Sequence, residues 1–386
     1  MYVSDTPALQ SLVDAIRPAG FVTIDTEFMR ERTYWPKLCL IQVGTDDVQA
    51  IIDPLAFDDL SPLWDLLADS SILKVMHAGS QDMEIFYQRM GSVPAPTFDT
   101  QIAATLAGFP QQVGYGALVQ EITGVTLDKS DTFTDWAKRP LSGTQIEYAL
   151  NDVRYLPQVY RKLRDDLAEQ GREGWLAPDF ARLTSPSTYE IVPENQYKRV
   201  KRYKSLNRRQ MGVLLKVTAW RELEAQRRDL PRKWVLGDES LIEVARRSPG
   251  NPEELRSIRG VGDKLQKSAY GRLLDAVKAG LAMSDDELPS VERKRRPMGD
   301  VDGAVDLMSA LVRLRAHEQG VAIPLLASRS DLERLARGDR EANPLMDGWR
   351  KTLIGDELLL LLAGRISLHA HEGRLMVVAD PDDESV

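Results

Sequence analysis

Four acidic residues in three separate stretches of the sequence have the types and spacing needed to bind divalent metal ions. Asp25 and Glu27 follow the β-rich run 21–24. Residues i and i+2 of a strand point to the same face, so these two carboxylates project together. Two adjacent anions are unfavourable without a cation between them, and carboxylate oxygens suit a hard divalent metal. Alone, such a pair also occurs at ordinary solvated strand ends.

The other two acids stand at places where a helix could present them. Asp82 follows the expected strand 72–76 and a turn at Gly79, which places it in the first turn of the next helix, where an acid also simply complements the helix N-terminus. Tyr148 and Asp152 are four residues apart within a helical pattern, so they lie one above the other on one face. A phenol with an ordinary pKa near 10 is a poor base at neutral pH and is better suited to orienting a water molecule.

The combination and order of these elements resemble the three-motif pattern of the DEDDy exonucleases. Residues 98–101, 127–130 and 134–141, read as Phe-Asp-Thr-Gln, Leu-Asp-Lys-Ser and Thr-Asp-Trp-Ala-Lys-Arg-Pro-Leu, are similar to ribonuclease D in particular. The resemblance covers about residues 1–175. It implies a ribonuclease H-like mixed sheet flanked by helices and a 3′→5′ exonuclease that releases nucleoside 5′-monophosphates.

The resemblance also implies a role for each acidic residue and for the tyrosine. Asp25, Glu27 and Asp152 would hold one divalent ion, and Asp25, with Asp82 nearby or through water, a second. Tyr148 would position the attacking water. Mg²⁺ or Mn²⁺ is favoured because every candidate ligand atom is oxygen.

Five further residues are candidates for substrate contact, each with a structural alternative. Phe28 and Met29 follow the acid pair and could stack on the terminal bases or pack in the core. His77 is more often a structural histidine, and Lys129 and Arg139 are either phosphate neighbours or surface charges.

The elements that position these groups follow from the hydrophobic pattern. Runs 21–24, 38–43 and 48–52 predict three neighbouring strands with brief connections, and 72–76 a strand that leads into a helix. Residues 143–170 predict a long amphipathic helix that Pro157 bends or divides. Cys39, the sole cysteine, is expected to be a buried small hydrophobe in the run 38–41.

The remainder of the chain predicts two small all-helical bundles and no strand. The first resembles an HRDC domain, through Trp-Arg-Glu at 220–222 and the turn 258–262; the second keeps only the position and helical character. The expected domains are an exonuclease domain at 1–178, a connector at 179–203, HRDC domain 1 at 204–284, a linker at 285–300 and an HRDC-like domain 2 at 301–376. The basic run 198–204 suggests an RNA-guiding surface.

Composition limits these expectations only weakly. The 386 residues carry a net charge of −8, which says little about local fields and so neither supports nor excludes a nucleic-acid substrate. There is no secretory signal pattern and no apolar run long enough to span a bilayer. We therefore expect a cytoplasmic protein, with a monomer as the default. The family resemblance implies an exoribonuclease that trims RNA with a single-stranded 3′ end, such as tRNA precursors. The alternatives are a DEDDy exonuclease acting mainly on DNA and an inactive RNA-binding scaffold.

Overall fold

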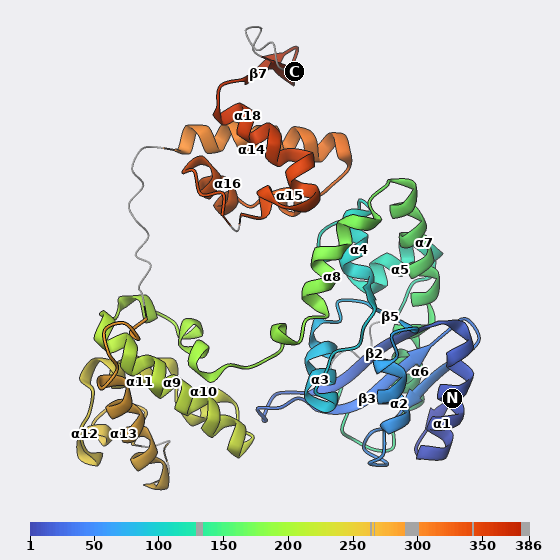
Figure 1. Ribbon diagram of the computed structural model, residues 1–386. Helices are drawn as coiled ribbons and strands as arrows, with labels where there is room; N and C mark the ends of the chain where they lie inside the picture. Colours follow the sequence, from blue (N-terminus) through green and yellow to red (C-terminus); the bar gives the residue numbers. More distant parts are fainter. Residues whose placement is uncertain (129–133, 263–264, 266, 290–300, 342, 380–386) are drawn as a thin grey trace. The chain divides into compact units, whose positions relative to one another are not determined.

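The computed structural model describes residues 1–386 except 129–133, 263–264, 266, 290–300, 342 and 380–386 (Figure 1). It divides into two compact units. Unit 1 comprises Met1–Glu27, Cys39–Tyr189 and Arg296–Val386, and unit 2 comprises Phe28–Leu38 and Glu190–Arg295. The division departs from a simple linear order, because a short segment of the expected exonuclease domain belongs to unit 2 and the last part of the chain belongs to unit 1. The expected domain boundaries therefore remain predictions.

A mixed β-sheet forms the centre of unit 1. Its strands in the described residues are β1 (Tyr2–Val3), β2 (Phe21–Met29), β3 (Lys37–Gly44), β4 (Gln49–Ile52), β5 (Leu73–Met76) and β6 (Thr97–Asp99). Their spatial order is β1-β4-β3-β2-β5-β6, with β3 and β4 antiparallel and β1–β4, β2–β5 and β5–β6 parallel. The predicted neighbouring strands are therefore present, and Cys39 is buried in β3 as expected.

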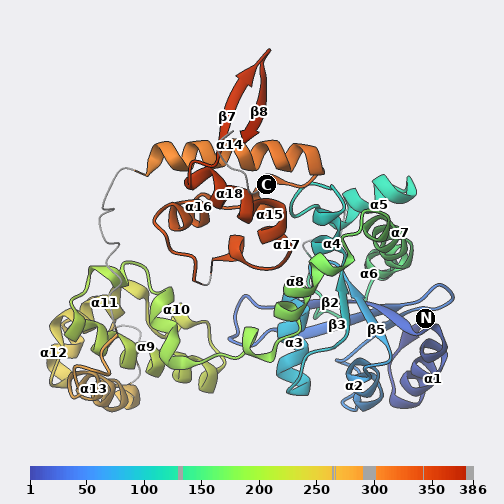
Figure 2. The ribbon, with the colours of Figure 1, turned by 45° about the horizontal axis from the view of Figure 1, so that its top comes forward.

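Helices cover both faces of this sheet. They are α1 (Thr6–Ile16), α2 (Ser61–Ala68), α3 (Ser80–Met90), α4 (Thr100–Leu106), α5 (Tyr115–Thr123), α6 (Gly143–Arg154), α7 (Leu156–Glu169) and α8 (Ala177–Leu183). In Figure 2, α1 and α2 lie below the sheet and α4 to α7 above it. The predicted long helix is divided between Arg154 and Leu156, and Pro157 stands in the first turn of α7, where a missing N–H costs nothing.

Unit 2 is built around one long helix. α9 (Arg208–Arg228) packs against α13 (Lys267–Leu281) and α11 (Asp238–Arg247), and α10 (Arg232–Val235) and α12 (Pro252–Arg256) complete the bundle. Asn207 begins α9 with a capping box, since its side chain accepts from Gln210 N while the Gln210 side chain accepts from Asn207 N. The helical prediction for this region is correct.

The last segment is helical at first but ends in strands. α14 (Asp302–Gln319), α15 (Ile323–Leu326), α16 (Arg329–Ala336), α17 (Gly348–Arg350) and α18 (Asp356–Leu362) precede β7 (Ile366–His371) and β8 (Arg374–Ala379). The expectation of an all-helical segment was wrong here. The β7–β8 hairpin turns at Glu372 and Gly373, both with positive φ, and a glutamate is a much weaker turn signal than the usual Asn-Gly or Asp-Gly.

Shorter turns of helix join these elements. The 3-10 helices are Arg17–Ala19, Glu173–Leu176, Pro186–Thr188, Pro193–Arg199, Tyr203–Ser205 and Pro344–Met346, and Lys351–Gly355 forms a π-helical turn. Within the described residues, no helix is long and apolar enough to cross a membrane.

Candidate active site

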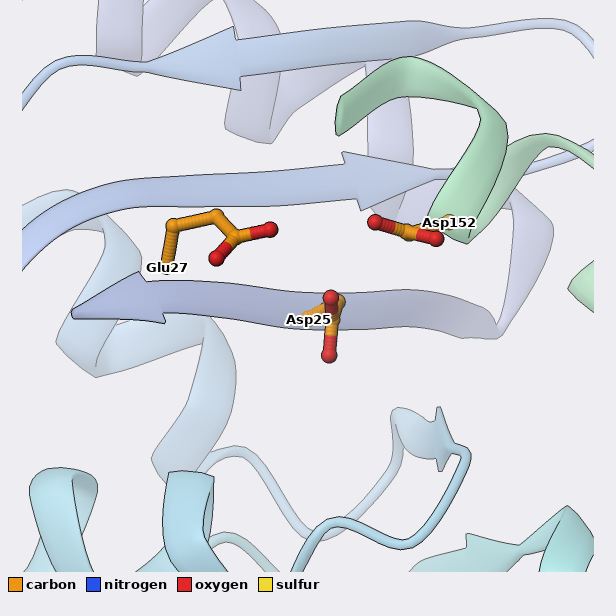
Figure 3. Close-up of side chains that lie close together, drawn as sticks. All are labelled: Asp25, Glu27 and Asp152. Carbon is orange, nitrogen blue, oxygen red and sulfur yellow. The ribbon is translucent and has the colours of Figure 1, made fainter. Parts of the chain in front are cut away.

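Strand β2 and helix α6 bring three of the four predicted metal ligands together. Asp25 and Glu27 lie two residues apart on β2, and Asp152 lies on α6. Figure 3 shows the carboxylates of Glu27 and Asp152 pointing toward one another, with Asp25 beside them on β2. One carboxylate oxygen from each lies within 4.8 Å of the others. Among the described residues, these three acids form the group of carboxylates that could hold a metal ion. Their oxygen atoms are close enough for one small cation to contact all three.

Packing between β2 and α6 fixes this arrangement. Thr23 Oγ1 donates to the Val153 carbonyl at 3.2 Å, which ties the strand of Asp25 to the helix of Asp152. Gly44 of neighbouring β3 leaves room for this contact, because a Cβ there would stand 2.8 Å from Thr23 Oγ1. A capping box begins α6, with Ser142 Oγ accepting from Gln145 N at 3.1 Å and Gln145 Oε1 accepting from Ser142 N at 2.8 Å.

The electrostatics of the cluster favour a bound cation. Burial, reinforced by the charges of Asp82, Asp152 and Glu27, raises the pKa of Asp25 well above its usual range. Burial also raises the pKa of Glu27 to about 8 and that of Asp152 to about 7. These carboxyl groups are costly to ionise together, and a divalent cation with oxygen ligands would remove that cost. The donor set therefore fits a divalent metal.

Asp82 stands next to the cluster and is not one of the three grouped carboxylates. It lies in the first turn of α3, as predicted, and is only 6% exposed. Its Oδ1 accepts a hydrogen bond from Thr26 Oγ1, the residue between Asp25 and Glu27. Burial raises its pKa to about 6. The position suits a carboxylate that reaches a second ion through water or after releasing Thr26.

Asp99 fixes the turn that presents Asp82, and sequence reasoning missed this role. Its carboxylate accepts from Ala78 N at 3.2 Å and Gly79 N at 2.8 Å, just before α3 begins. The same carboxylate caps α4 by accepting from Gln101 N at 2.8 Å and Ile102 N at 3.2 Å. The position of an Asp just before a helix predicts from sequence that it caps that helix. Its contact with the turn before α3 could not be predicted in this way, because the two partners are 20 residues apart in the sequence.

Two tyrosines flank Asp152. Tyr148 is one turn away on the same helix and partly exposed, with its ring centroid 6.0 Å from that of Trp136. Tyr115 was not predicted; its hydroxyl donates to the Asn151 carbonyl at 2.9 Å, and burial together with the charge of Asp152 raises its pKa. Tyr115 therefore holds the backbone beside Asp152.

The predicted substrate residues differ in what surrounds them. Phe28 and Met29 end strand β2 and are both partly exposed. His77 uses both ring nitrogens, with Nδ1 2.9 Å from Thr100 Oγ1 and Nε2 3.1 Å from the Val113 carbonyl oxygen, and burial lowers its pKa. Lys129 lies outside the described residues.

Arg139 is enclosed by protein acceptors. Its Nε and Nη2 donate to the two oxygens of Asp53, each at 2.6 Å, and Nη2 also donates to the Cys39 carbonyl at 2.7 Å. Nη1 donates to the carbonyls of Trp136 and Lys138 at 2.7 and 2.9 Å. All five guanidinium N–H groups are thus occupied, and a contact with a substrate phosphate would require breaking one of these bonds.

Comparison with known proteins places the same two regions in known families. A model described as a 3′-5′ exonuclease matches residues 1–168, and an HRDC domain model matches residues 210–277. Ribonuclease D of Granulibacter bethesdensis is 44% identical over 369 residues, which cover 95% of this chain and 93% of that protein. Ribonuclease D of Acidiphilium cryptum is 42% identical over 381 residues, which cover 98% and 97%.

A solved structure is similar over almost its whole length. Escherichia coli RNase D, described as an exoribonuclease involved in structured RNA processing, superposes with a TM-score of 0.82 at 35% sequence identity. The match covers 94% of this chain and 98% of that one. The HRDC match covers residues 210–277, and the HRDC-like character of the segment after residue 301 remains a prediction.

Proposed function

This chain belongs to the ribonuclease D family and is a 3′→5′ exoribonuclease, and from that premise we propose how its residues perform the reaction. Asp25, Glu27 and Asp152 hold one divalent ion, and Asp25 with Asp82 holds a second. The observation that carries this proposal is the meeting of three carboxylates within 4.8 Å at the end of β2 and on α6. Mg²⁺ or Mn²⁺ suits this all-oxygen donor set.

The residues of the site divide the chemical work between them. When bound, the divalent metal supplies charge neutralisation at the reacting phosphate and makes water a stronger acid. Tyr148 orients the attacking water toward the terminal phosphodiester, and its position one turn from Asp152 supports this role. The bond to the last nucleotide is cleaved, and a nucleoside 5′-monophosphate is released.

We propose that the substrate is RNA with a single-stranded 3′ end, tRNA precursors and other small structured RNAs included. Phe28 and Met29 contact the terminal bases, which their partial exposure immediately after Glu27 supports. The basic run 198–204 guides the RNA strand: Lys198, Arg199, Lys201, Arg202 and Lys204 are all exposed. We place the protein in the cytoplasm as a monomer.

The decisive experiment compares matched 5′-labelled RNA and DNA oligonucleotides, each with a single-stranded 3′ tail. We expect stepwise shortening of the RNA with Mg²⁺ or Mn²⁺, and none in chelator or with the Asp152→Asn variant. Preferential shortening of DNA would keep the chemistry and overturn the RNA substrate. Tight binding without shortening of either strand would favour an RNA-binding scaffold.

A further inference from the structure

The loop that follows the metal-binding strand is part of the helical unit that contains the HRDC domain. Glu27 and Phe28 are consecutive residues of β2, yet Phe28–Leu38 belongs to unit 2 together with Glu190–Arg295. Tyr34, at the middle of this segment, is 3% exposed and lies in the hydrophobic core that α9, α11 and α13 form. A residue of the exonuclease sequence is therefore part of the HRDC core.

The Tyr34 side chain is bound by polar groups of the HRDC domain. Its hydroxyl donates to Glu222 Oε1 and accepts from Gln226 Nε2 at 3.0 Å and from Arg232 Nη2 at 3.1 Å. The Arg232 guanidinium also stands over the tyrosine ring, 4.7 Å from its centroid. The hydroxyl thus has one acceptor and two donors, and the ring has a cation on its face.

The backbone of the loop is held as well. Asp229 Oδ1 accepts from both Tyr34 N and Trp35 N at 3.0 Å. Asp229 ends α9 in a left-handed conformation, with φ of 47°. Because two successive amides and one side chain are fixed at once, the loop has little freedom to rotate or slide on the HRDC domain.

The acceptor of the Tyr34 hydroxyl is a buried charged group, the Glu222 carboxylate, and apolar packing alone would not require such a group. Glu222 is fully buried, and Arg232 Nη2 pairs with its Oε1 at 2.6 Å while Nε contacts both of its oxygens. A buried ion pair adds little to stability compared with apolar packing, but it is costly to leave incomplete, so it enforces one geometry. Burial also raises the pKa of Tyr34 to about 12, which keeps the hydroxyl protonated as a donor.

We propose that Tyr34 is a positioning residue for the exonuclease reaction, through which the HRDC domain fixes the end of β2 that carries Glu27, Phe28 and Met29. Only residues 30–33 separate the end of β2 at Met29 from Tyr34. Any added motion of the Tyr34 side chain in its binding position would therefore also move the end of the strand. This inference rests on the proposed roles of those three residues. It gives the HRDC domain a part in catalysis that is separate from RNA binding.

The test compares full-length Tyr34→Phe with wild type. The variant keeps the ring in the core and removes only the hydroxyl. We expect kcat/KM on a single-stranded RNA tail to fall about tenfold, mostly through kcat, since small misplacements of reacting groups have large effects. Mn²⁺ binding in the absence of RNA, measured by calorimetry, should weaken several-fold because Glu27 is less well placed.

Tyr270→Phe is the matched control. Tyr270 lies in the same hydrophobic core at 6% exposure, and its hydroxyl donates only weakly, to the Gly262 carbonyl at 3.5 Å. The Tyr270→Phe change should leave kcat and Mn²⁺ binding unchanged even if it lowers the melting temperature.

The outcomes separate this inference from the proposed function. Wild-type activity that does not depend on divalent metal would reject the metal roles themselves, whatever Tyr34→Phe does. Metal-dependent wild-type activity with unchanged kcat and Mn²⁺ binding in Tyr34→Phe, at a lower melting temperature, would leave Tyr34 a purely structural residue and overturn the inference.

Discussion

At the scale of single residues, Asp25 is a carboxylate whose pKa is raised by burial and by three neighbouring acids. Asp25→Asn removes one negative charge and keeps the side chain's shape. We expect kcat to fall at least ~100-fold, because a charge contact at the reacting centre is lost. In chelator the variant should melt at the same or a higher temperature than wild type, since like-charge repulsion is relieved. Near-normal activity of the purified variant would reject Asp25 as a ligand.

The same carboxyl groups predict how pH acts on the metal-free protein. Burial raises the pKa of Glu27 to about 8 and that of Asp152 to about 7. At pH values between the ordinary carboxyl pKa and these raised values, the folded state therefore binds more protons than the unfolded state. The free energy of unfolding consequently decreases as pH rises through this range. We expect the melting temperature in chelator to fall from about pH 5 to about pH 8.

Two comparisons check this pH dependence. The Asp152→Asn variant should show a smaller fall, because one of the titrating groups is gone. Divalent ions compete with the same protons, so the increase in melting temperature that Mn²⁺ causes should grow from about pH 6 to about pH 8. An increase that shrinks over this range would mean that Mn²⁺ binds elsewhere.

At the scale of elements, the sequence could predict the relative placement of those candidate site residues that share one element. Asp25 and Glu27 follow the two-residue period of a strand, and Tyr148 and Asp152 the four-residue period of a helix turn. Asp99 and Tyr34 act through contacts across 20 and 188 residues, respectively, that no local period encodes. Arg139 is a further example. The sequence left open whether its guanidinium is a phosphate neighbour or a surface charge, and only the structure shows the five protein acceptors that surround it.

Asp99 gives a prediction for the turn between β5 and α3. Asp99→Ala leaves four backbone N–H groups without their acceptor, at Ala78, Gly79, Gln101 and Ile102. We expect a loss of about 2 kcal/mol in the free energy of unfolding, from the lost cap and the unsatisfied donors. Because the same turn places Asp82, kcat should also fall.

A second helix cap serves as the control for Asp99. Asp5 begins α1 by accepting from Ala8 N at 2.8 Å at an exposed site. Asp5→Ala should cost about 1 kcal/mol in stability and leave kcat unchanged. If both variants lose stability and neither loses activity, Asp99 is a helix cap only.

At the scale of the whole molecule, the last part of the chain shares a hydrophobic core with the exonuclease region. Leu106, Leu118 and Leu163 belong to one cluster with Leu311 and Leu358. The rings of Trp175 and Trp349 stack with centroids 4.6 Å apart and planes 5° from parallel. Sequence alone assigned the two segments to separate domains, because the apolar faces of their helices do not indicate which partner covers them.

Trp349→Ala tests this shared core. Trp349 is 8% exposed, and the Arg350 guanidinium lies 4.4 Å from its ring centroid. Truncation should cost about 3–5 kcal/mol in the free energy of unfolding of unit 1, as is usual for a buried tryptophan. The control, Trp234→Ala, removes a side chain that is 53% exposed and should change stability by less than about 1 kcal/mol. Similar effects of the two changes would contradict a shared core.

The charge distribution gives a prediction for RNA binding by the full-length protein. Lys198, Lys201 and Lys204 are exposed, and none of them forms a salt bridge with another described residue. Binding single-stranded RNA through lysines releases counterions, so affinity falls with salt with a slope of about −0.7 per phosphate contact. Replacing all three by Gln should therefore make the slope of log K against log[salt] shallower by about 2.

The control must change net charge equally without touching the basic run. Lys162, Arg247 and Lys351 are each paired with an acid, namely Asp166, Glu243 and Asp356, at 2.5–2.7 Å. Their triple Gln variant alters the total charge by the same amount, so any difference between the two variants reports local contacts. Filter-binding titrations at several salt concentrations, with Asp152→Asn in the background to prevent cleavage, measure both slopes. Equal slopes in the two variants would show that RNA responds only to the overall charge, and the basic run would lose its proposed guiding role.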